Sequence, residues 1–170
     1  AFFYPCPKAD KYLRDDWDIP YPTAILGRLI KLSQVFKRQG IDFGIGFSPN
    51  NIPSPSRLIQ KAFKSKDEQI NQISPTILGV FFDDIAPAEV SDTLADLQVD
   101  IAEYSASESN AEQFISVPSY YSNDQILIRT LGDMPANYWL DFGKLDDKFD
   151  IFWTGDQILS LGYDRSGLEK

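Results

Sequence analysis

Short apolar runs that end in polar loops recur along this chain of 170 residues, and each is typical of a β-strand. The five runs lie at residues 1–4, 41–47, 76–82, 113–117 and 150–153. The third run is almost continuously apolar, as expected of a strand that is buried on both faces of a parallel sheet. It ends abruptly in two acidic residues, Asp83 and Asp84.

Between these runs, apolar residues recur at three- and four-residue spacing, which predicts helices. The helical patterns run from about residue 23 to Gly40, over 56–72, between Pro87 and Tyr104, and over 138–144. Gly40 follows Lys37 and Arg38, an arrangement that commonly ends a helix. The polar stretch 105–110 is expected to interrupt the pattern, and a further helix is expected after Tyr121 with a poorly defined register.

The regular alternation of strand and helix predicts right-handed β-α units around a parallel sheet. A doubly wound sheet needs a glycine-rich phosphate loop after its first strand, and no such loop is present. A β/α barrel places its chemistry at the carboxyl ends of its strands. The unusual polar residues of this chain follow its strands at Lys8, Ser48, Asp83, Asp84, Tyr121 and Thr154.

We therefore expect an α/β fold of the (β/α)8 TIM-barrel type. A complete barrel takes about 250 residues, so this chain is expected to form a partial barrel of about five β-α units. We expect residues 1–170 to be a single domain, the central portion of such a barrel. Open sheet edges favour self-association.

The charge of the chain limits its partners. It carries 25 acidic and 16 basic residues, a net charge of −9. Such a chain repels phosphate backbones and anionic lipid, so neither nucleic acid nor a membrane is expected as a partner. No apolar run is long enough to span a bilayer.

The absence of histidine removes nucleophile mechanisms that depend on a Ser-His or Cys-His pair. A single cysteine, Cys6, supports neither an intrachain disulfide nor a zinc cluster. Carboxylates, lysines and tyrosines remain as proton carriers. Scattered aspartates do not have the spacing of a magnesium site, so no metal or cofactor is expected. The apolar opening without methionine or a basic leader is typical of the inside of a domain, and the localisation stays open.

Asp83 and Asp84 are the sharpest chemical feature. Two carboxylates directly after a buried strand are costly unless they are solvated, hydrogen-bonded or bound to a cation. Held close together they resist ionising together, so one of them can act as an acid near neutral pH. The alternative interpretation is that Asp84 caps the turn or helix that follows.

The other polar residues at strand ends each have two interpretations. Lys8 can hold a sugar hydroxyl or tune a carboxylate, or it is an ordinary solvated lysine. Tyr121 can donate a hydrogen bond or stack on a sugar, whereas paired tyrosines are more often part of the core. A tryptophan at a strand end, such as Trp153 beside Thr154, is at least as often a structural residue as a functional one.

The order of these motifs resembles glycoside hydrolase family 84, the retaining β-N-acetylglucosaminidases that include protein O-GlcNAcases and bacterial hyaluronidase-like enzymes. Five segments carry the resemblance: Cys6-Pro7-Lys8-Ala9-Asp10, Phe47-Ser48-Pro49, Phe82-Asp83-Asp84-Ile85, Pro118-Ser119-Tyr120-Tyr121 and Trp153-Thr154-Gly155. They are similar to the family's Ala-Pro-Lys-Asp-Asp, Ser-Pro-Gly, Asp-Asp-Ile, Cys-Pro-Thr-x-Tyr and Trp-Thr-Gly segments, in the same order.

The resemblance implies hydrolysis of terminal β-linked N-acetylglucosamine (GlcNAc), with the substrate's own acetamido oxygen as nucleophile and an oxazoline intermediate. It implies that Asp83 accepts the acetamide N–H, and that Asp84 protonates the leaving oxygen and then deprotonates water. It further implies binding roles for Tyr121 at the acetamido oxygen, Thr154 and Ile158 at the acetamide methyl, and Lys8 at a ring hydroxyl. The implied partner is a GlcNAc-containing glycan or glycoprotein, and no cofactor is implied.

The chain departs from the family pattern in several places. The family's first strand, with a Gly-Phe-Tyr-Gly segment, and its late Trp-Asp-Asn-Tyr-Pro segment lie outside the sequence. Ala9 replaces an acidic residue, Val117 a cysteine and Ser119 a threonine. These departures keep open a truncated, non-catalytic relative or a carbohydrate-binding fragment, and a metal-dependent hydrolase that uses the same aspartates is a third hypothesis.

Overall fold

The computed structural model of the chain describes residues 2–3, 7–49, 56–83 and 91–162. Its strands are β1 (Phe2–Phe3), β2 (Asp42–Phe47), β3 (Ile77–Phe81), β4 (Gln113–Val117) and β5 (Phe149–Ile151). Its helices are α1 (Thr23–Arg38), α2 (Ser56–Ile73), α3 (Leu94–Glu108), α4 (Gln125–Leu131) and α5 (Tyr138–Phe142), with short 3-10 turns η1 (Pro7–Ala9) and η2 (Lys11–Leu13).

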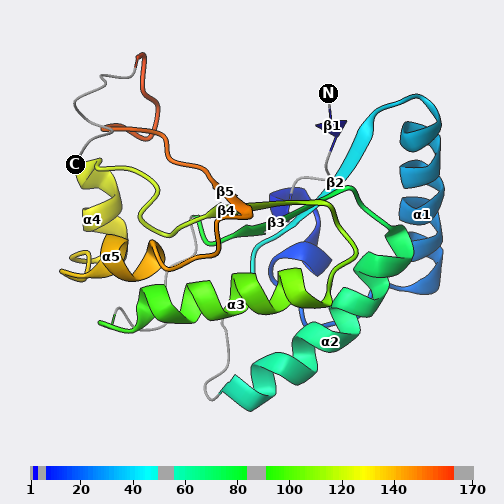
Figure 1. Cartoon of the computed structure of the whole chain (residues 1–170), viewed down its shortest axis with the longest axis horizontal. Helices are drawn as coiled ribbons and strands as arrows, with labels where there is room; N and C mark the ends of the chain where they lie inside the picture. The colour runs from blue at the N-terminus through cyan, green and yellow to red at the C-terminus, as the bar shows by residue number, and fades with distance from the viewer. Residues whose placement is uncertain (1, 4–6, 50–55, 84–90, 163–170) are drawn as a thin grey trace.

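The five strands form one parallel sheet in the order β1-β2-β3-β4-β5. Each strand therefore lies beside its successor, and right-handed crossovers place the intervening helices on one side of the sheet. Figure 1 shows α1, α2 and α3 along that side. A sheet wound in a single direction with helices on one face curls as a barrel does, whereas a doubly wound sheet reverses its strand order. The structure thus agrees with a partial β/α barrel.

The two faces of the sheet differ in the side chains they carry. The face toward the helices carries Phe43, Phe47 and Val80, which are fully buried in the core together with Phe63 of α2. Branched and aromatic residues on this face supply the apolar area that holds sheet and helices together.

The opposite face is rich in glycine around one aromatic ring. Gly46 pairs with Gly79 across β2 and β3, and the ring of Phe81 lies over both of them. A Cβ added at either glycine would collide with that ring. Glycine at these positions leaves room for an aromatic side chain directly against the sheet.

Most predicted elements are confirmed, with shifts at their ends. The expected interruption at 105–110 is wrong, because α3 continues to Glu108. Ser105 and Ala106 are buried and small, so they extend the packed face of the helix rather than ending it. The last strand is Phe149–Ile151 rather than 150–153, because Phe149 pairs with Phe114 and their rings lie 5.5 Å apart.

The ends of the other helices shift as well. The expected helix at 138–144 ends at Phe142, and the helix expected after Tyr121 is α4, residues Gln125–Leu131. The helix expected from Pro87 is seen from Leu94, and residues 84–90 lie outside the described part of the chain.

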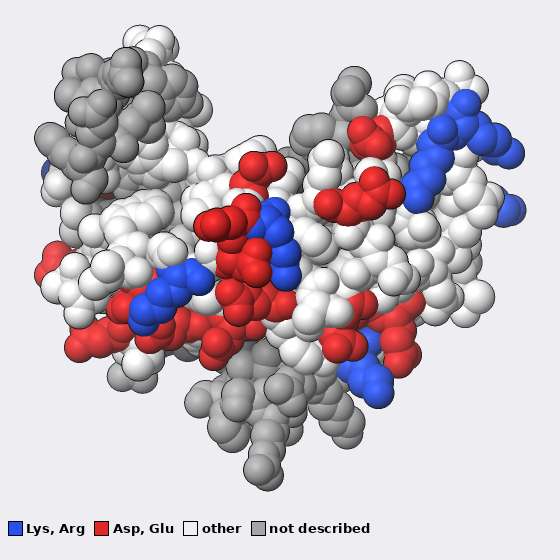
Figure 2. All heavy atoms as spheres, viewed as in Figure 1, with Lys and Arg blue, Asp and Glu red and all other residues white. Residues whose placement is uncertain are grey.

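Acidic side chains gather on the outer surface. Figure 2 shows them over the lower middle of the face where Figure 1 places α3. Lys144 forms ion pairs there with Asp96 of α3 at 3.1 Å and with Asp141 of α5 at 2.8 Å. Within the described ranges, no helix is both long and apolar enough to cross a membrane.

Candidate active site

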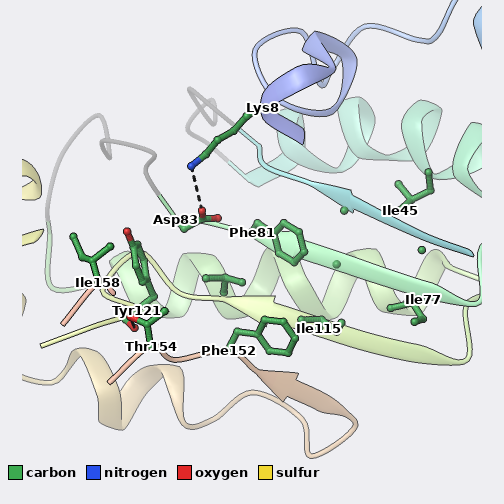
Figure 3. Close-up of a pocket in the computed structure, with 14 residues that line it drawn as sticks. Lys8, Ile45, Ile77, Phe81, Asp83, Ile115, Tyr121, Phe152, Thr154 and Ile158 are labelled. Carbon is green, nitrogen blue, oxygen red and sulfur yellow. Dashed lines mark hydrogen bonds and ion pairs between the residues drawn. The ribbon is translucent and has the colours of Figure 1, made fainter. Parts of the chain in front are cut away.

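A cavity of about 360 Å³ opens at the carboxyl ends of the strands and extends over the glycine-rich face of the sheet (Figure 3). Five of its lining residues come from the loops that follow four strands: Lys8, Asp83, Tyr121, Thr154 and Ile158. Its floor comes from the strands and from the residue after β5: Gly44, Ile45, Gly46, Ile77, Gly79, Phe81, Ile115, Val117 and Phe152. The cavity therefore combines an apolar floor with polar groups at one end, as small-molecule sites commonly do.

Lys8 and Asp83 face each other across the mouth of this cavity. Lys8 Nζ lies 3.9 Å from Asp83 Oδ2, and the two side chains are 52% and 27% exposed. An ion pair with this much water around it contributes at most about 1 kcal/mol to stability. Its effect is therefore to orient two polar groups toward the cavity, where Figure 3 shows them joined.

Hydrogen bonds from a buried lysine of α2, Lys66, hold the loop that carries Lys8. Lys66 Nζ donates hydrogen bonds to the carbonyls of Tyr12 at 2.8 Å and Ile19 at 2.7 Å. Its ammonium lies 4.5 Å from the centre of the Tyr21 ring, and burial lowers the pKa of Lys66 to about 8. Two carbonyls and an aromatic face supply the contacts that a buried cation needs.

The Tyr21 hydroxyl donates to Asp10 Oδ2 at 2.9 Å, and Asp10 Oδ1 accepts from the Tyr12 backbone N–H. Gln69 of α2 bonds to both the N–H and the carbonyl of Tyr21. These contacts fix the segment between β1 and α1, which carries Lys8 into the cavity.

The loops after β4 and β5 are joined to each other by hydrogen bonds. Thr154 N–H donates to the Tyr121 carbonyl at 2.9 Å, and the Ser122 hydroxyl donates to the Gly155 carbonyl at 2.9 Å. Gly155 has a φ of 93°, a conformation that glycine adopts easily. Tyr121 and Thr154 are therefore held side by side at one end of the cavity, the end where Figure 3 also shows Asp83.

Asp124 holds the backbone of Ile158 at the same end of the cavity as Tyr121 and Thr154. Its Oδ1 accepts from Ile126 N–H at 2.9 Å and caps α4, while its Oδ2 accepts from Ile158 N–H at 3.2 Å. These two backbone hydrogen bonds lower the pKa of Asp124, in that order of importance. The hydroxyl of Thr154 donates to the Gln157 carbonyl at 3.0 Å, so its hydrogen is used within the loop.

Of the six residues to which the family resemblance gives a role, the structure brings five into one cavity: Lys8, Asp83, Tyr121, Thr154 and Ile158. The sixth, Asp84, lies outside the described residues, as does Cys6. Ser48 does not line the cavity: it is buried, and its N–H donates to the Leu13 carbonyl at 2.7 Å. Tyr120 is a core residue whose hydroxyl donates to the Gly132 carbonyl at 3.1 Å.

Sequence reasoning missed Asp124, Phe81 and Phe152. Asp124 had a signal, because an aspartate just before a helical apolar pattern is a typical N-cap. The two phenylalanines had none, since nothing in a strand pattern shows which face lines a cavity. Among the described residues, no group of three or more His, Cys, Asp or Glu is placed to hold a metal ion.

The sequence model of the β-N-acetylglucosaminidase family matches residues 1–169. The chain belongs to this family of glycoside hydrolases. Two solved structures are similar to it. A mutant of the O-GlcNAc hydrolase of Thermobaculum terrenum has a TM-score of 0.74 and 23% identity, covering 98% of this chain and 37% of that one. CpGH84B has a TM-score of 0.77 and 24% identity, covering 98% of this chain and 30% of that one.

At these identities the two structures establish a shared fold, and they agree with a partial TIM-type barrel in this β-N-acetylglucosaminidase family member. The chain spans well under half the length of either protein, 37% and 30% respectively. The fold resemblance and the family assignment predicted from the ordered motifs are confirmed.

Proposed function

We propose that this chain carries part of the active site of an enzyme that hydrolyses terminal β-linked N-acetylglucosamine with retention, through an oxazoline intermediate. The observation that supports this most is the single cavity lined by Lys8, Asp83, Tyr121, Thr154 and Ile158, residues separated by up to 150 positions. The substrate is a GlcNAc-containing glycan or glycoprotein. The 170 residues act as one domain, a proposal supported by the described part of the chain, where most buried apolar side chains form one continuous core.

In the first step, the acetamido oxygen of the substrate attacks the anomeric carbon while the glycosidic C–O bond breaks. Asp83 accepts a hydrogen bond from the acetamide N–H and so stabilises the positive charge that develops on the forming ring. Asp84 gives its proton to the departing oxygen. In the second step, Asp84 takes a proton from the water that attacks the anomeric carbon, and the oxazoline opens.

The remaining residues bind and orient. The Tyr121 hydroxyl donates a hydrogen bond to the acetamido oxygen of the substrate. Thr154 and Ile158 enclose the methyl group of the same acetamide with apolar surface. Lys8, which is half exposed beside Asp83, binds a ring hydroxyl. Holding the acetamido oxygen near the anomeric carbon makes the attack effectively unimolecular, a large source of rate enhancement.

A leaving-group series tests the separate roles of the two aspartates. Asp84→Asn should slow hydrolysis of aryl β-N-acetylglucosaminides with poor leaving groups far more than those with good ones, because only the former need a proton. Asp83→Asn should slow both. Asp147→Asn is the matched control, since Asp147 is exposed in the loop before the amino end of β5, whereas the cavity lies at the carboxyl ends of the strands. Equal and mild effects of the two active-site variants would contradict the assignment.

The same protein preparations separate the enzyme from a carbohydrate-binding fragment. Calorimetric titration with N-acetylglucosamine measures binding without chemistry. Binding that depends on Asp83 and Tyr121 but comes without turnover of any aryl substrate would indicate the binding fragment.

A further inference from the structure

A closed set of buried hydrogen bonds lies behind the cavity, where α3 and α5 meet the carboxyl ends of β3 and β4. It joins Gln98 of α3, Ser119 after β4, and Tyr138 of α5, each no more than 2% exposed. Tyr138 hydroxyl donates to Gln98 Oε1 at 2.6 Å, and Gln98 Nε2 donates to Ser119 Oγ at 2.7 Å. None of the three lines the cavity.

The direction of every proton in this set is fixed. The Ser119 N–H donates to the Tyr138 oxygen at 3.0 Å, so the Tyr138 hydrogen must point to Gln98. Because Gln98 donates to Ser119 Oγ, the Ser119 hydrogen must point onward, and it reaches the Phe82 carbonyl at 3.0 Å. Burial raises the pKa of Tyr138, which keeps its hydroxyl a donor. Fully satisfied buried networks of this kind are rigid.

The network ends on the residue that precedes Asp83. Phe82 is held on both sides, because its N–H donates to the Val117 carbonyl at 2.8 Å and its carbonyl accepts from Ser119. Ser119 is in turn two residues before Tyr121. One hydroxyl therefore connects the backbone that carries the carboxylate to the backbone that carries the tyrosine.

We propose that Gln98, Ser119 and Tyr138 are positioning residues that fix the Asp83 carboxylate relative to Tyr121. The catalytic part of this inference rests on the proposed function, in which both groups hold one acetamido group. A displacement of about 1 Å between groups that must act together can cost about 100-fold in rate.

The test compares two buried tyrosines. Tyr138→Phe removes the hydroxyl that organises the network. Tyr120→Phe removes the hydroxyl of an equally buried residue, whose ring lies 5.0 Å from that of Tyr138 but whose hydroxyl donates to the Gly132 and Asp133 carbonyls instead. For hydrolysis of an aryl β-N-acetylglucosaminide, we expect Tyr138→Phe to lower kcat/KM by about 10- to 100-fold. Tyr120→Phe should stay within about twofold of the unaltered chain.

Titration with N-acetylglucosamine distinguishes positioning from simple loss of folded protein. A misplaced Asp83 weakens the affinity while the number of sites per chain is unchanged. Partial unfolding instead lowers the number of sites and leaves the affinity of the remainder as it was. Equal effects of Tyr138→Phe and Tyr120→Phe on kcat/KM and affinity would overturn the proposal.

A second position supplies a rescue. Ser119→Ala removes the hydroxyl that reaches Phe82 and should behave as Tyr138→Phe does, whereas Ser119→Thr keeps that hydroxyl and should recover most of the activity. A threonine variant no better than the alanine variant would contradict the role of the hydroxyl.

Amide hydrogen exchange makes the inference independent of turnover. If the unaltered chain neither binds the sugar nor hydrolyses the substrate, the proposed function fails. The positioning role then stands if Tyr138→Phe speeds exchange at the amides of Asp83 and Ser119 by about tenfold or more relative to Tyr120→Phe. It fails if the two variants exchange alike.

Discussion

Asp67 of α2 is a buried carboxyl group with a measurable effect on stability. The residue is 3% exposed, and within the described residues neither of its side-chain oxygens has a hydrogen-bond partner. Burial, and to a smaller extent the charge of Glu108, raises the pKa of Asp67 from 3.8 to about 7. The folded chain therefore holds this acid neutral at pH 5 and must bury a charge at pH 8.

The sign of the pH dependence follows from proton binding. Between about pH 4 and 7 the folded chain keeps a proton that the unfolded chain has lost, so stability falls as pH rises through this window. Linkage between pKa values of 3.8 and about 7 makes this group's contribution about 2.5 kcal/mol smaller at pH 8 than at pH 5. The chain has no histidine, so the background of other groups that titrate in this range is low.

Asp67→Asn removes the titration while keeping the shape of the side chain. Urea unfolding, followed by tryptophan fluorescence at pH 5, 6, 7 and 8, gives the free energy of unfolding. The difference between variant and unaltered chain should move in favour of the variant by about 2.5 kcal/mol from pH 5 to pH 8. Glu68→Gln makes the same acid-to-amide change at the exposed neighbouring position and is the matched control for the loss of a carboxyl group. Parallel pH curves for Asp67→Asn and the unaltered chain would refute the reasoning.

Two further predictions concern the cavity and its supports. Lys66→Met deprives two loop carbonyls of their donor and should lower the free energy of unfolding by about 2–4 kcal/mol. Lys64→Met, at an exposed position of the same helix, is the control and should change this free energy by less than about 0.5 kcal/mol. Urea unfolding measures both. The methyl group added by Gly46→Ala would collide with the Phe81 ring. This variant should have a lower melting temperature and a free energy of unfolding that is lower by about 1–3 kcal/mol. The methyl group added by Gly27→Ala in α1 meets open space, so this variant should raise the free energy of unfolding by about 0.5–1 kcal/mol. A destabilised Gly27→Ala variant, or a Gly46→Ala variant as stable as the unaltered chain, would contradict this packing.

The strands and their order were predictable because their cause is local. Apolar runs bounded by polar loops define β2, β3 and β4 to within a residue or two. Since parallel strands end at a common edge, the polar residues after them had to lie near one another. The convergence of Lys8, Asp83 and Thr154 on one cavity is a consequence of this rule.

The buried polar contacts were not predictable because their cause is tertiary. Gln98 and Tyr138 are 40 positions apart and look like ordinary helix residues in the sequence. Lys66 and Asp67 are charged neighbours on a helical pattern and would be expected in solvent, yet both are buried. The extension of α3 past Ser105 likewise depends on the surface against which that residue packs.

The most direct test of the central claim is the rate of hydrolysis of aryl β-N-acetylglucosaminides whose acetamido methyl carries an increasing number of fluorine atoms. Fluorine withdraws electrons from the acetamido oxygen and weakens it as a nucleophile. If that oxygen attacks within the cavity of Asp83 and Tyr121, kcat should fall steeply with each fluorine atom added. A rate that is unchanged by fluorination would contradict the account.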